Sequence, residues 1–253
     1  LFNAVSRVVV KVGTGVLTDS RKQPDQAQME QLVSQIAELR RGGKEVVLVS
    51  SGAVGAGMGV LGYHKRPAEL AELQACAAVG QSRLMATYER LFGAFNLSVA
   101  QILLTHDDLE HHDRHLNARN SLITLLRHGI VPIINENDVV SVTELKFGDN
   151  DKLSALVAAL LPADLVVILT TVDGVIEHFG KPEARTLPVV QRIDAALEKM
   201  AGGTDSATAV GGMASKIQAA KIAIRSGIPL VIASGRKKRA LVRVVSGEEE
   251  GTL

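Results

Sequence analysis

Residues 8–15 read Val-Val-Val-Lys-Val-Gly-Thr-Gly, an apolar run that carries one lysine and is closed by glycine. A short run of β-branched residues bounded by glycine is typical of a buried strand. Burying an ammonium group is costly unless the group is paired or bound to an anion. Lys11 is therefore either a phosphate ligand or a strand-end lysine whose ammonium group reaches solvent.

Comparable apolar runs recur along the chain and alternate with helical patterns. The expected strands after the first are residues 46–49, 99–104, 131–135, 165–169 and 228–232. The expected helices are residues 26–41, 69–92, 116–127, 152–161 and 214–225. A glycine-rich stretch runs through Gly62, and residues 139–147 alternate loosely, which favours a hairpin. Strands that alternate with helices pair in parallel through right-handed crossovers. The sequence thus predicts an α/β fold, a three-layer αβα sandwich with a mainly parallel central sheet, in a single domain over residues 1–253.

The composition narrows the class of protein. The chain has 253 residues, of which 46% are hydrophobic and 3% aromatic, and its formal net charge is +1. That balance gives no reason to expect binding to nucleic acid or to an anionic membrane, and no apolar run is long enough to span a bilayer. Cys76 is the only cysteine, which excludes an intrachain disulfide and a cysteine-based zinc site and favours a cytoplasmic protein.

Two more glycine-rich clusters lie beside expected strand ends or helix starts. Ser51–Gly52–Ala53 follows a strand, and Gly211–Gly212–Met213 opens a helix that carries Lys216 in its first turn. Free N–H groups at a helix start, with a lysine one turn in, form an anion site. Each cluster also suits an ordinary tight turn, for which glycine is needed anyway.

Polar residues follow the ends of several expected strands, where ligands bind in parallel sheets. Asn135 and Asp138 follow one strand, and Asn150 and Asp151 precede an apolar helix. A carboxylate such as Asp138 suits the ammonium group of an amino acid, and Asp151, placed between two lysines, would orient both toward a transferring phosphoryl group. Taken singly, these residues also suit turns and helix caps. The convergence of Lys11, Ser51, Asn135–Asp138 and Thr170–Thr171 at strand ends indicates one shared site.

Other patterns carry less weight. Gly57, Gly59 and Gly62 match a dinucleotide-binding spacing, but the preceding strand ends too early and no acidic residue follows at the required distance. The histidines of residues 106–115 fit no metal-site template and suggest a solvated loop, so no metal site is predicted. The basic run Arg236–Arg239 is expected to start a solvated helix near a nucleotide. No Walker loop is present.

In this order, the motifs resemble the amino-acid kinase family, and within it the branch whose members phosphorylate the γ-carboxylate of L-glutamate. The resemblance spans nearly the whole chain. The segments that carry it are Val10–Gly13, Ser51–Ala53, Ala78–Ser82, Leu116–Arg119, Ile134–Asp138, Gly148–Asp151, Leu153–Leu156 and Gly211–Met213. The Asn-Glu-Asn-Asp and Gly-Asp-Asn-Asp pair favours this branch over acetylglutamate or uridylate kinases.

The resemblance implies an amino-acid kinase fold and the transfer of a phosphoryl group from ATP, accompanied by Mg²⁺, in the first step of proline biosynthesis. The implied catalytic residues are Lys11, Lys216 and Asp151. The implied glutamate-binding residues are Ser51, Gly52, Ala53, Asn135, Asp138 and Asn150. The implied nucleotide-binding residues are Lys11, Gly13, Thr170, Thr171, Gly174, Gly211, Gly212, Met213 and Lys216. Feedback inhibition by proline and assembly as a homodimer or homotetramer are also expected.

Three departures bear on this expectation. The family often has Thr-Asp in place of Thr170–Thr171. It often continues with Gly-Leu-Tyr and an Asp-Pro pair, where this chain has Gly174–Val175–Ile176–Glu177–His178–Phe179. Many relatives carry a C-terminal PUA domain, which is not expected here. The alternatives are another kinase of the same fold, acting on acetylglutamate, a carbamate or a phosphomonoester, and a nucleotide-binding regulator without activity. A nicotinamide dehydrogenase is disfavoured because the glycine pattern is misplaced.

Overall fold

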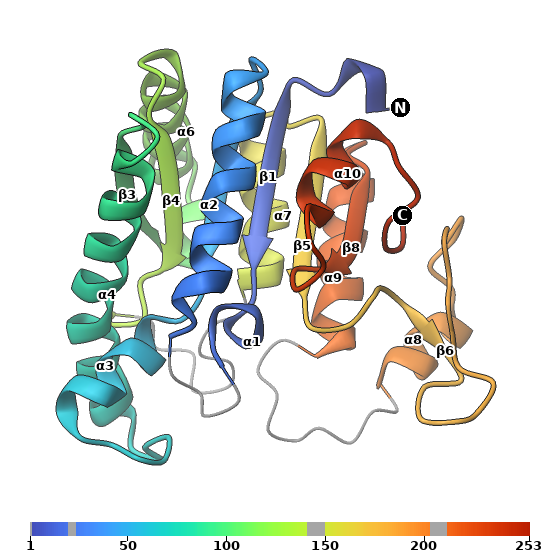
Figure 1. Cartoon of the computed structure of the whole chain (residues 1–253), viewed down its shortest axis with the longest axis horizontal. Helices are drawn as coiled ribbons and strands as arrows, with labels where there is room; N and C mark the ends of the chain where they lie inside the picture. Colours follow the sequence, from blue (N-terminus) through green and yellow to red (C-terminus); the bar gives the residue numbers. More distant parts are fainter. Residues whose placement is uncertain (1, 20–23, 141–149, 203–211) are drawn as a thin grey trace.

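The computed structural model describes residues 2–19, 24–140, 150–202 and 212–253. In these residues six parallel strands form one sheet, in the order β3-β4-β2-β1-β5-β8. The strands are β1 (Arg7–Val12), β2 (Glu45–Ser50), β3 (Val99–Leu104), β4 (Val131–Glu136), β5 (Leu165–Thr170) and β8 (Leu230–Ser234). Because every strand runs in the same direction, their carboxyl ends meet at one edge of the sheet, the lower edge in Figure 1.

Helices cover both faces of the sheet, which confirms the three-layer αβα sandwich. The helices on one face are α2 (Gln26–Arg41), α4 (Leu70–Gly93) and α10 (Ala240–Ser246), and those on the other are α6 (His112–Arg127), α7 (Asn150–Leu160) and α9 (Met213–Arg225). Figure 1 shows α2 in front of the sheet and α7 behind it. The shorter helices are α1 (Thr14–Leu17), α3 (Ala53–Leu61), α5 (His106–Glu110) and α8 (Ala195–Gly202), after a 3₁₀ turn at Phe2–Ala4.

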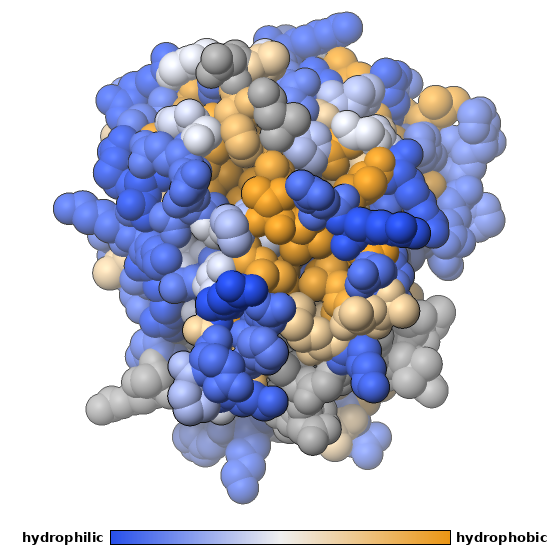
Figure 2. Space-filling model, turned by 90° about the vertical axis from the view of Figure 1, so that its right-hand side faces the viewer, coloured by the Kyte–Doolittle hydropathy of each residue, from blue (hydrophilic) through white to orange (hydrophobic). Residues whose placement is uncertain are grey.

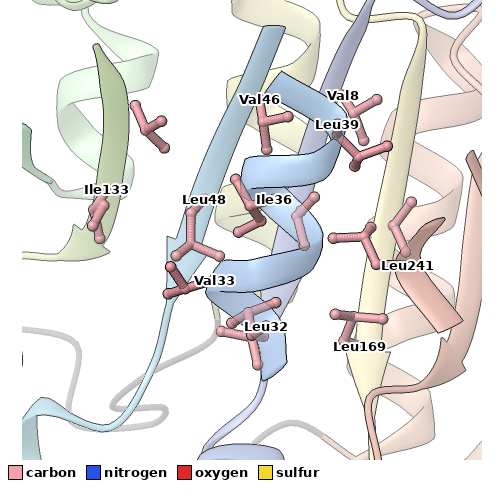
Figure 3. Packing of buried hydrophobic residues seen from close by; sticks show 14 of the residues in the cluster. Val8, Leu32, Val33, Ile36, Leu39, Val46, Leu48, Ile133, Leu169 and Leu241 are labelled. Carbon is pink, nitrogen blue, oxygen red and sulfur yellow. The ribbon is translucent and has the colours of Figure 1, made fainter. Parts of the chain in front are cut away.

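The apolar strands separate two hydrophobic cores. Side chains alternate between the two faces of a strand, so Val8 and Val10 pack on the α2 face whereas Val9 packs on the α7 face. Figure 3 shows α2 laid over the sheet, with Ile36 among the apolar side chains of the strands. Strands buried on both faces read as continuous apolar runs, which is why the sequence locates them well.

The glycine-rich stretch after Ser51 forms a helix, α3, that its composition does not predict. A Cβ on Gly57 would lie 1.8 Å from the carbonyl oxygen of Cys76, and a Cβ on Gly80 would lie 1.7 Å from that of Ala53. These glycines therefore let α3 and α4 cross at backbone contact. Gly57 serves this crossing, and Gly62, with a left-handed φ of 77°, ends α3, so both have a structural role that needs no dinucleotide.

Three other regions differ from expectation. Residues 106–115 form α5 and the first turn of α6 and are not a loop, because Thr105 and Asp108 make a reciprocal capping box. The basic run Arg236–Arg239 precedes α10, and that helix is buried, not solvated. A small hairpin, β6 (Ile176–Glu177) with β7 (Arg185–Thr186), was not indicated by the sequence. The hairpin expected over residues 139–147 falls largely outside the described residues.

The edge of the sheet at β8 is partly closed by the end of the chain. Thr252 and Ile232 exchange backbone hydrogen bonds of 2.9 and 2.8 Å. Figure 2 looks onto this side of the molecule and shows apolar side chains reaching the surface between polar ones. In the part of the chain that the structure describes, no helix combines the length and the apolar character needed to cross a membrane.

Candidate active site

The predicted site residues gather at the carboxyl edge of the sheet. Lys11 is the fifth residue of β1, where it pairs in register with Val49 of β2 and Ile168 of β5. Ser51 directly follows β2, and Asn135 lies near the end of β4. Ligands of open parallel sheets bind beyond this edge, so the topology places these side chains at one site.

The centre of the site is a carboxylate between two lysines. Lys11 Nζ lies 2.7 Å from Asp151 Oδ1, and Lys216 Nζ lies 3.1 Å from Asp151 Oδ2. All three residues are buried, with exposed fractions of 4% for each lysine and 1% for the aspartate. Although burial alone would raise the pKa of the Asp151 carboxyl, the two ammonium groups hold this pKa below its ordinary value. Two cations facing one anion leave an excess positive charge, which suits a phosphoryl group.

Helix starts and a glycine hold this arrangement. Asp151 lies in the first turn of α7 and Lys216 in the first turn of α9, and these two helices pack against each other. Ser215 Oγ donates to Asp151 Oδ2 at 2.6 Å, which adds a third donor to the carboxylate. A Cβ on Gly13 would lie 3.4 Å from Lys11 Nζ, so the glycine leaves space beside the ammonium group.

A buried network of amides lies next to these charges. Asn150 Nδ2 is within hydrogen-bonding distance of Ser50 O (3.3 Å), Ser51 Oγ (3.0 Å) and Asn135 Oδ1 (2.9 Å). Asn135 Oδ1 also accepts from the backbone N–H of Glu136, while Asn135 Nδ2 donates to Gln81 Oε1 at 2.9 Å. Both functional atoms of Asn135 thus have protein partners, so this residue fixes Asn150 and Gln81 in place.

Asp138 supplies a buried carboxylate to the same region. It is 6% exposed, and its Oδ1 has no hydrogen-bond partner among the described residues. Burial, reinforced by the nearby Glu136 carboxylate and opposed by the Arg66 guanidinium, raises the pKa of Asp138 to about 7. An ammonium group bound here would therefore meet a carboxyl that ionises near neutral pH.

The residues predicted to bind the nucleotide are spread around β5 and the start of α9. Thr170 ends β5, and its carbonyl oxygen accepts from the backbone N–H of Gly235, while Thr171 is exposed. Gly174 is buried against Thr252 and Thr186, so chain packing determines its conformation. Two more members of the set, Gly212 and Met213, cap and begin α9, and Met213 also packs on the apolar core. Gly211 lies outside the described residues.

The structure adds residues that the sequence did not single out. Gln81 lies within the Ala78–Ser82 motif and Ser215 directly precedes Lys216, but their hydrogen bonds depend on elements far away in the chain. Tyr88 is fully buried on α4, and its hydroxyl is 2.7 Å from Ser50 Oγ at the end of β2. A tyrosine inside an apolar helix pattern gives no signal of such a contact. Among the described residues, no group of three or more His, Cys, Asp or Glu side chains is arranged to hold a metal ion.

Comparison of the sequence with models of protein families identifies the class of protein that has this fold and site. Residues 6–234 match the model of the amino acid kinase family. The chain belongs to this family.

Two curated relatives of the chain carry the name of a single activity within this family. The chain is 48% identical over 255 residues to a glutamate 5-kinase from Geobacter sulfurreducens, an alignment that spans 100% of the chain and 68% of the relative. It is 50% identical over 254 residues to a glutamate 5-kinase from Bordetella parapertussis, spanning 100% of the chain and 67% of the relative. The chain therefore spans about two thirds of the length of each of these relatives.

Solved structures support the fold. A carbamate kinase from Giardia lamblia bound to AMP-PNP superposes with a TM-score of 0.69 at 20% identity, covering 99% of each chain. A UMP kinase from Ureaplasma parvum superposes with a TM-score of 0.66 at 16% identity, covering 98% of this chain and 97% of the other. At such low identity the similarity establishes the fold alone. The substrate has to be inferred from the residues of the site.

Proposed function

We propose that this chain transfers a phosphoryl group from ATP to the γ-carboxylate of L-glutamate, giving L-glutamyl 5-phosphate in the first step of proline biosynthesis. The observation that carries this proposal is the buried Lys11–Asp151–Lys216 cluster, which lies beside an amide network and a buried carboxylate at Asp138. The cluster suits a phosphoryl group, and Asp138 suits an ammonium group. The names of the relatives support glutamate, which carries both an ammonium group and the γ-carboxylate that would accept the phosphoryl group.

The chemistry needs charge neutralisation and alignment more than proton transfer. A carboxylate is already ionised and nucleophilic at neutral pH, so no strong general base is required. Lys11 and Lys216 neutralise charge that spreads over the transferring group, and Asp151 holds their ammonium groups apart and in place. Preorganised charges of this kind lower the barrier because they need not reorient during the reaction.

The remaining predicted residues divide between the two substrates. Asp138 accepts from the ammonium group of glutamate, and Asn150 and Ser51 form the polar wall beside it, with Gly52 and Ala53 leaving room for the substrate at the start of α3. Asn135 positions Asn150. The nucleotide is proposed to contact Gly13, Thr170, Thr171, Gly174, Gly211, Gly212 and Met213.

Magnesium is proposed to arrive with the nucleotide. Mg²⁺ is commonly held by substrate phosphates, water and one or two carboxylates, without a dedicated protein cage. The Asp151 carboxylate at the proposed phosphoryl site is engaged by Lys11 and Lys216, so the phosphates of the nucleotide and water would supply most of the ligands of the ion. The ion would supply further charge neutralisation on the phosphates.

Three finer expectations belong to the same proposal. The enzyme is expected to act in the cytoplasm, to be inhibited by proline, and to assemble as a homodimer or homotetramer. Proline resembles the cyclised carbon skeleton of glutamate and carries the same α-carboxylate and a cationic nitrogen, so it would compete for the groups around Asp138.

A substrate panel tests the proposal. The chain is incubated with Mg-ATP and, separately, L-glutamate, N-acetyl-L-glutamate, L-aspartate, carbamate or UMP, and ADP release is measured. Glutamate is expected to give the highest kcat/KM. N-acetyl-L-glutamate should react poorly because it lacks the ammonium group that would donate a hydrogen bond to Asp138. Preference for the acetylated substrate or for UMP would overturn the proposal.

A further inference from the structure

The direction of the amide network is fixed by the backbone at both of its ends. Asn150 must turn its NH₂ group toward the carbonyl oxygen of Ser50, because a carbonyl oxygen only accepts. Asn135 must turn its oxygen toward the N–H of Glu136, because a backbone N–H only donates. The NH₂ group of Asn135 therefore faces Gln81, whose side-chain oxygen accepts from it. The identity of each amide atom follows from these contacts.

With the amides in these orientations, one donor of the network, the NH₂ group of Gln81, is left without a partner in the part of the chain that the structure describes. Gln81 is 8% exposed, and its Nε2 has no hydrogen-bond partner among the described residues. Asn150 Oδ1, in the same network, and Asp138 Oδ1, three positions after Asn135 in the chain, are buried acceptors without a hydrogen-bond partner among those residues. A buried polar atom left without a partner is costly, so a bound group is expected to satisfy all three.

Gln81 also lies close to the segment proposed to bind the substrate. Its neighbour Gly80 packs against the carbonyl oxygen of Ala53, at the start of α3. Through Asn135 and Asn150 the same side chain is linked to Ser51. The α3–α4 crossing thus brings Gln81 of α4 to the strand end that carries Ser51, although the two residues lie 30 positions apart.

We propose that Gln81 is a specificity-determining residue whose NH₂ group donates a hydrogen bond to the α-carboxylate of the substrate. The inference rests on the proposed function and extends it. One donor and two acceptors are the complement of an α-amino acid zwitterion, whose carboxylate accepts and whose ammonium group donates. Gln81 accordingly selects substrates with a free α-carboxylate, while Asp138 and Asn150 accept from the ammonium group.

The substitution Gln81→Glu tests this role most sharply. It keeps an oxygen that accepts from Asn135 and replaces the donor by a carboxylate oxygen, which repels the α-carboxylate of glutamate. Loss of a hydrogen bond to a charged group predicts that the KM for glutamate rises about 10- to 100-fold, while the KM for ATP stays unchanged. Glutamate α-amide, whose γ-carboxylate is intact, can donate to the introduced carboxylate. The ratio of kcat/KM for glutamate over this amide is therefore expected to fall about 100-fold.

Gln35→Glu is the matched control. Gln35 is another buried glutamine, 6% exposed on α2, and its oxygen accepts from the backbone N–H of Leu241 while its Nε2 donates to Gln31 O. Its replacement is expected to lower the Tm without changing either KM or the ratio between the two substrates. Should Gln81→Glu fail to fold, Gln81→Met, which keeps the length but has no donor, is expected to raise the KM for glutamate about tenfold.

The outcomes separate the two proposals. If the unsubstituted chain shows no glutamate-dependent turnover, the proposed function is overturned and this inference falls with it. If that chain is active and the Gln81 variants keep its KM for glutamate and its preference over the α-amide, the inference alone is overturned, because a water molecule then satisfies the amide. A changed ratio in Gln81→Glu with an unchanged ratio in Gln35→Glu supports the inference.

Discussion

Lys216 approaches the Asp151 carboxylate from a helix that begins more than 60 residues further along the chain. Its charge counts most when negative charge spreads over the transferring phosphoryl group. Lys216→Ala is therefore expected to lower kcat by about 10²- to 10³-fold, as loss of one preorganised charge commonly does, with little change in the KM for glutamate. Steady-state kinetics with glutamate varied at saturating ATP measures both constants.

The control for this substitution lies on the same helix. Lys221 pairs with Glu198 at 2.7 Å, away from Asp151, so Lys221→Ala should leave kcat unchanged. A Lys216→Ala enzyme with normal kcat and a raised KM for glutamate would assign Lys216 to substrate binding and contradict the proposed role.

Asp138 makes glutamate binding depend on pH. Because burial raises the pKa of this carboxyl to about 7, only about a tenth of it is ionised near pH 6 and about nine tenths near pH 8. The substrate ammonium group binds the ionised form, so the KM for glutamate is expected to fall about tenfold between about pH 6 and about pH 8. Asp138→Asn should raise this KM and abolish its dependence on pH. An unchanged pH profile in Asp138→Asn would remove Asp138 from the ammonium site.

The same carboxyl should affect the stability of the empty protein in the opposite sense. The folded state holds its proton up to about pH 7, whereas an unfolded aspartate loses its proton near pH 4. The contribution of this group to stability is thus fully present below about pH 4 and is lost as the pH rises to about 7. The Tm of Asp138→Asn relative to the unsubstituted chain should therefore rise between about pH 5 and about pH 8.

At the scale of elements, the crossing of α3 and α4 depends on the absence of side chains. A Cβ on Gly80 would lie 1.7 Å from the carbonyl oxygen of Ala53, whereas a Cβ on Gly93 of the same helix would meet nothing within 4 Å. Gly80→Ala is expected to destabilise the protein by about 3 kcal/mol or more, because the helices must separate. Gly93→Ala should be neutral or stabilising by up to about 1 kcal/mol. Urea unfolding of both variants checks this, and equal effects would contradict the close crossing.

The elements also show which parts of the fold the sequence can reveal. Strands such as residues 7–12 are buried on both faces, so each is visible as a local apolar run. Helix α3 is not visible, because glycine is a poor helix former and only the packing against α4 explains its use. Likewise Lys11, Asp151 and Lys216 could be proposed from motifs, but the hydrogen bond between Gln81 and Asn135 joins residues 54 positions apart and has no local signature.

At the scale of the whole molecule, the site exists only when the sheet is complete. Its charged centre combines residue 11 of β1, residue 151 of α7 and residue 216 of α9, and the two cores on either face of the sheet hold these elements in register. Parallel strands and their crossovers thus convert distant sequence positions into one cluster. This cluster is proposed to transfer a phosphoryl group to a carboxylate.

The most direct measurement is the trapping of the acyl phosphate that such a transfer must form. The chain is incubated with Mg-ATP, L-glutamate and hydroxylamine, and γ-glutamyl hydroxamate and ADP are both quantified. One hydroxamate is expected for each ADP, with both products suppressed to the same extent in Lys216→Ala. ADP formed without hydroxamate would contradict the proposed function, because the phosphoryl acceptor would then not be the γ-carboxylate.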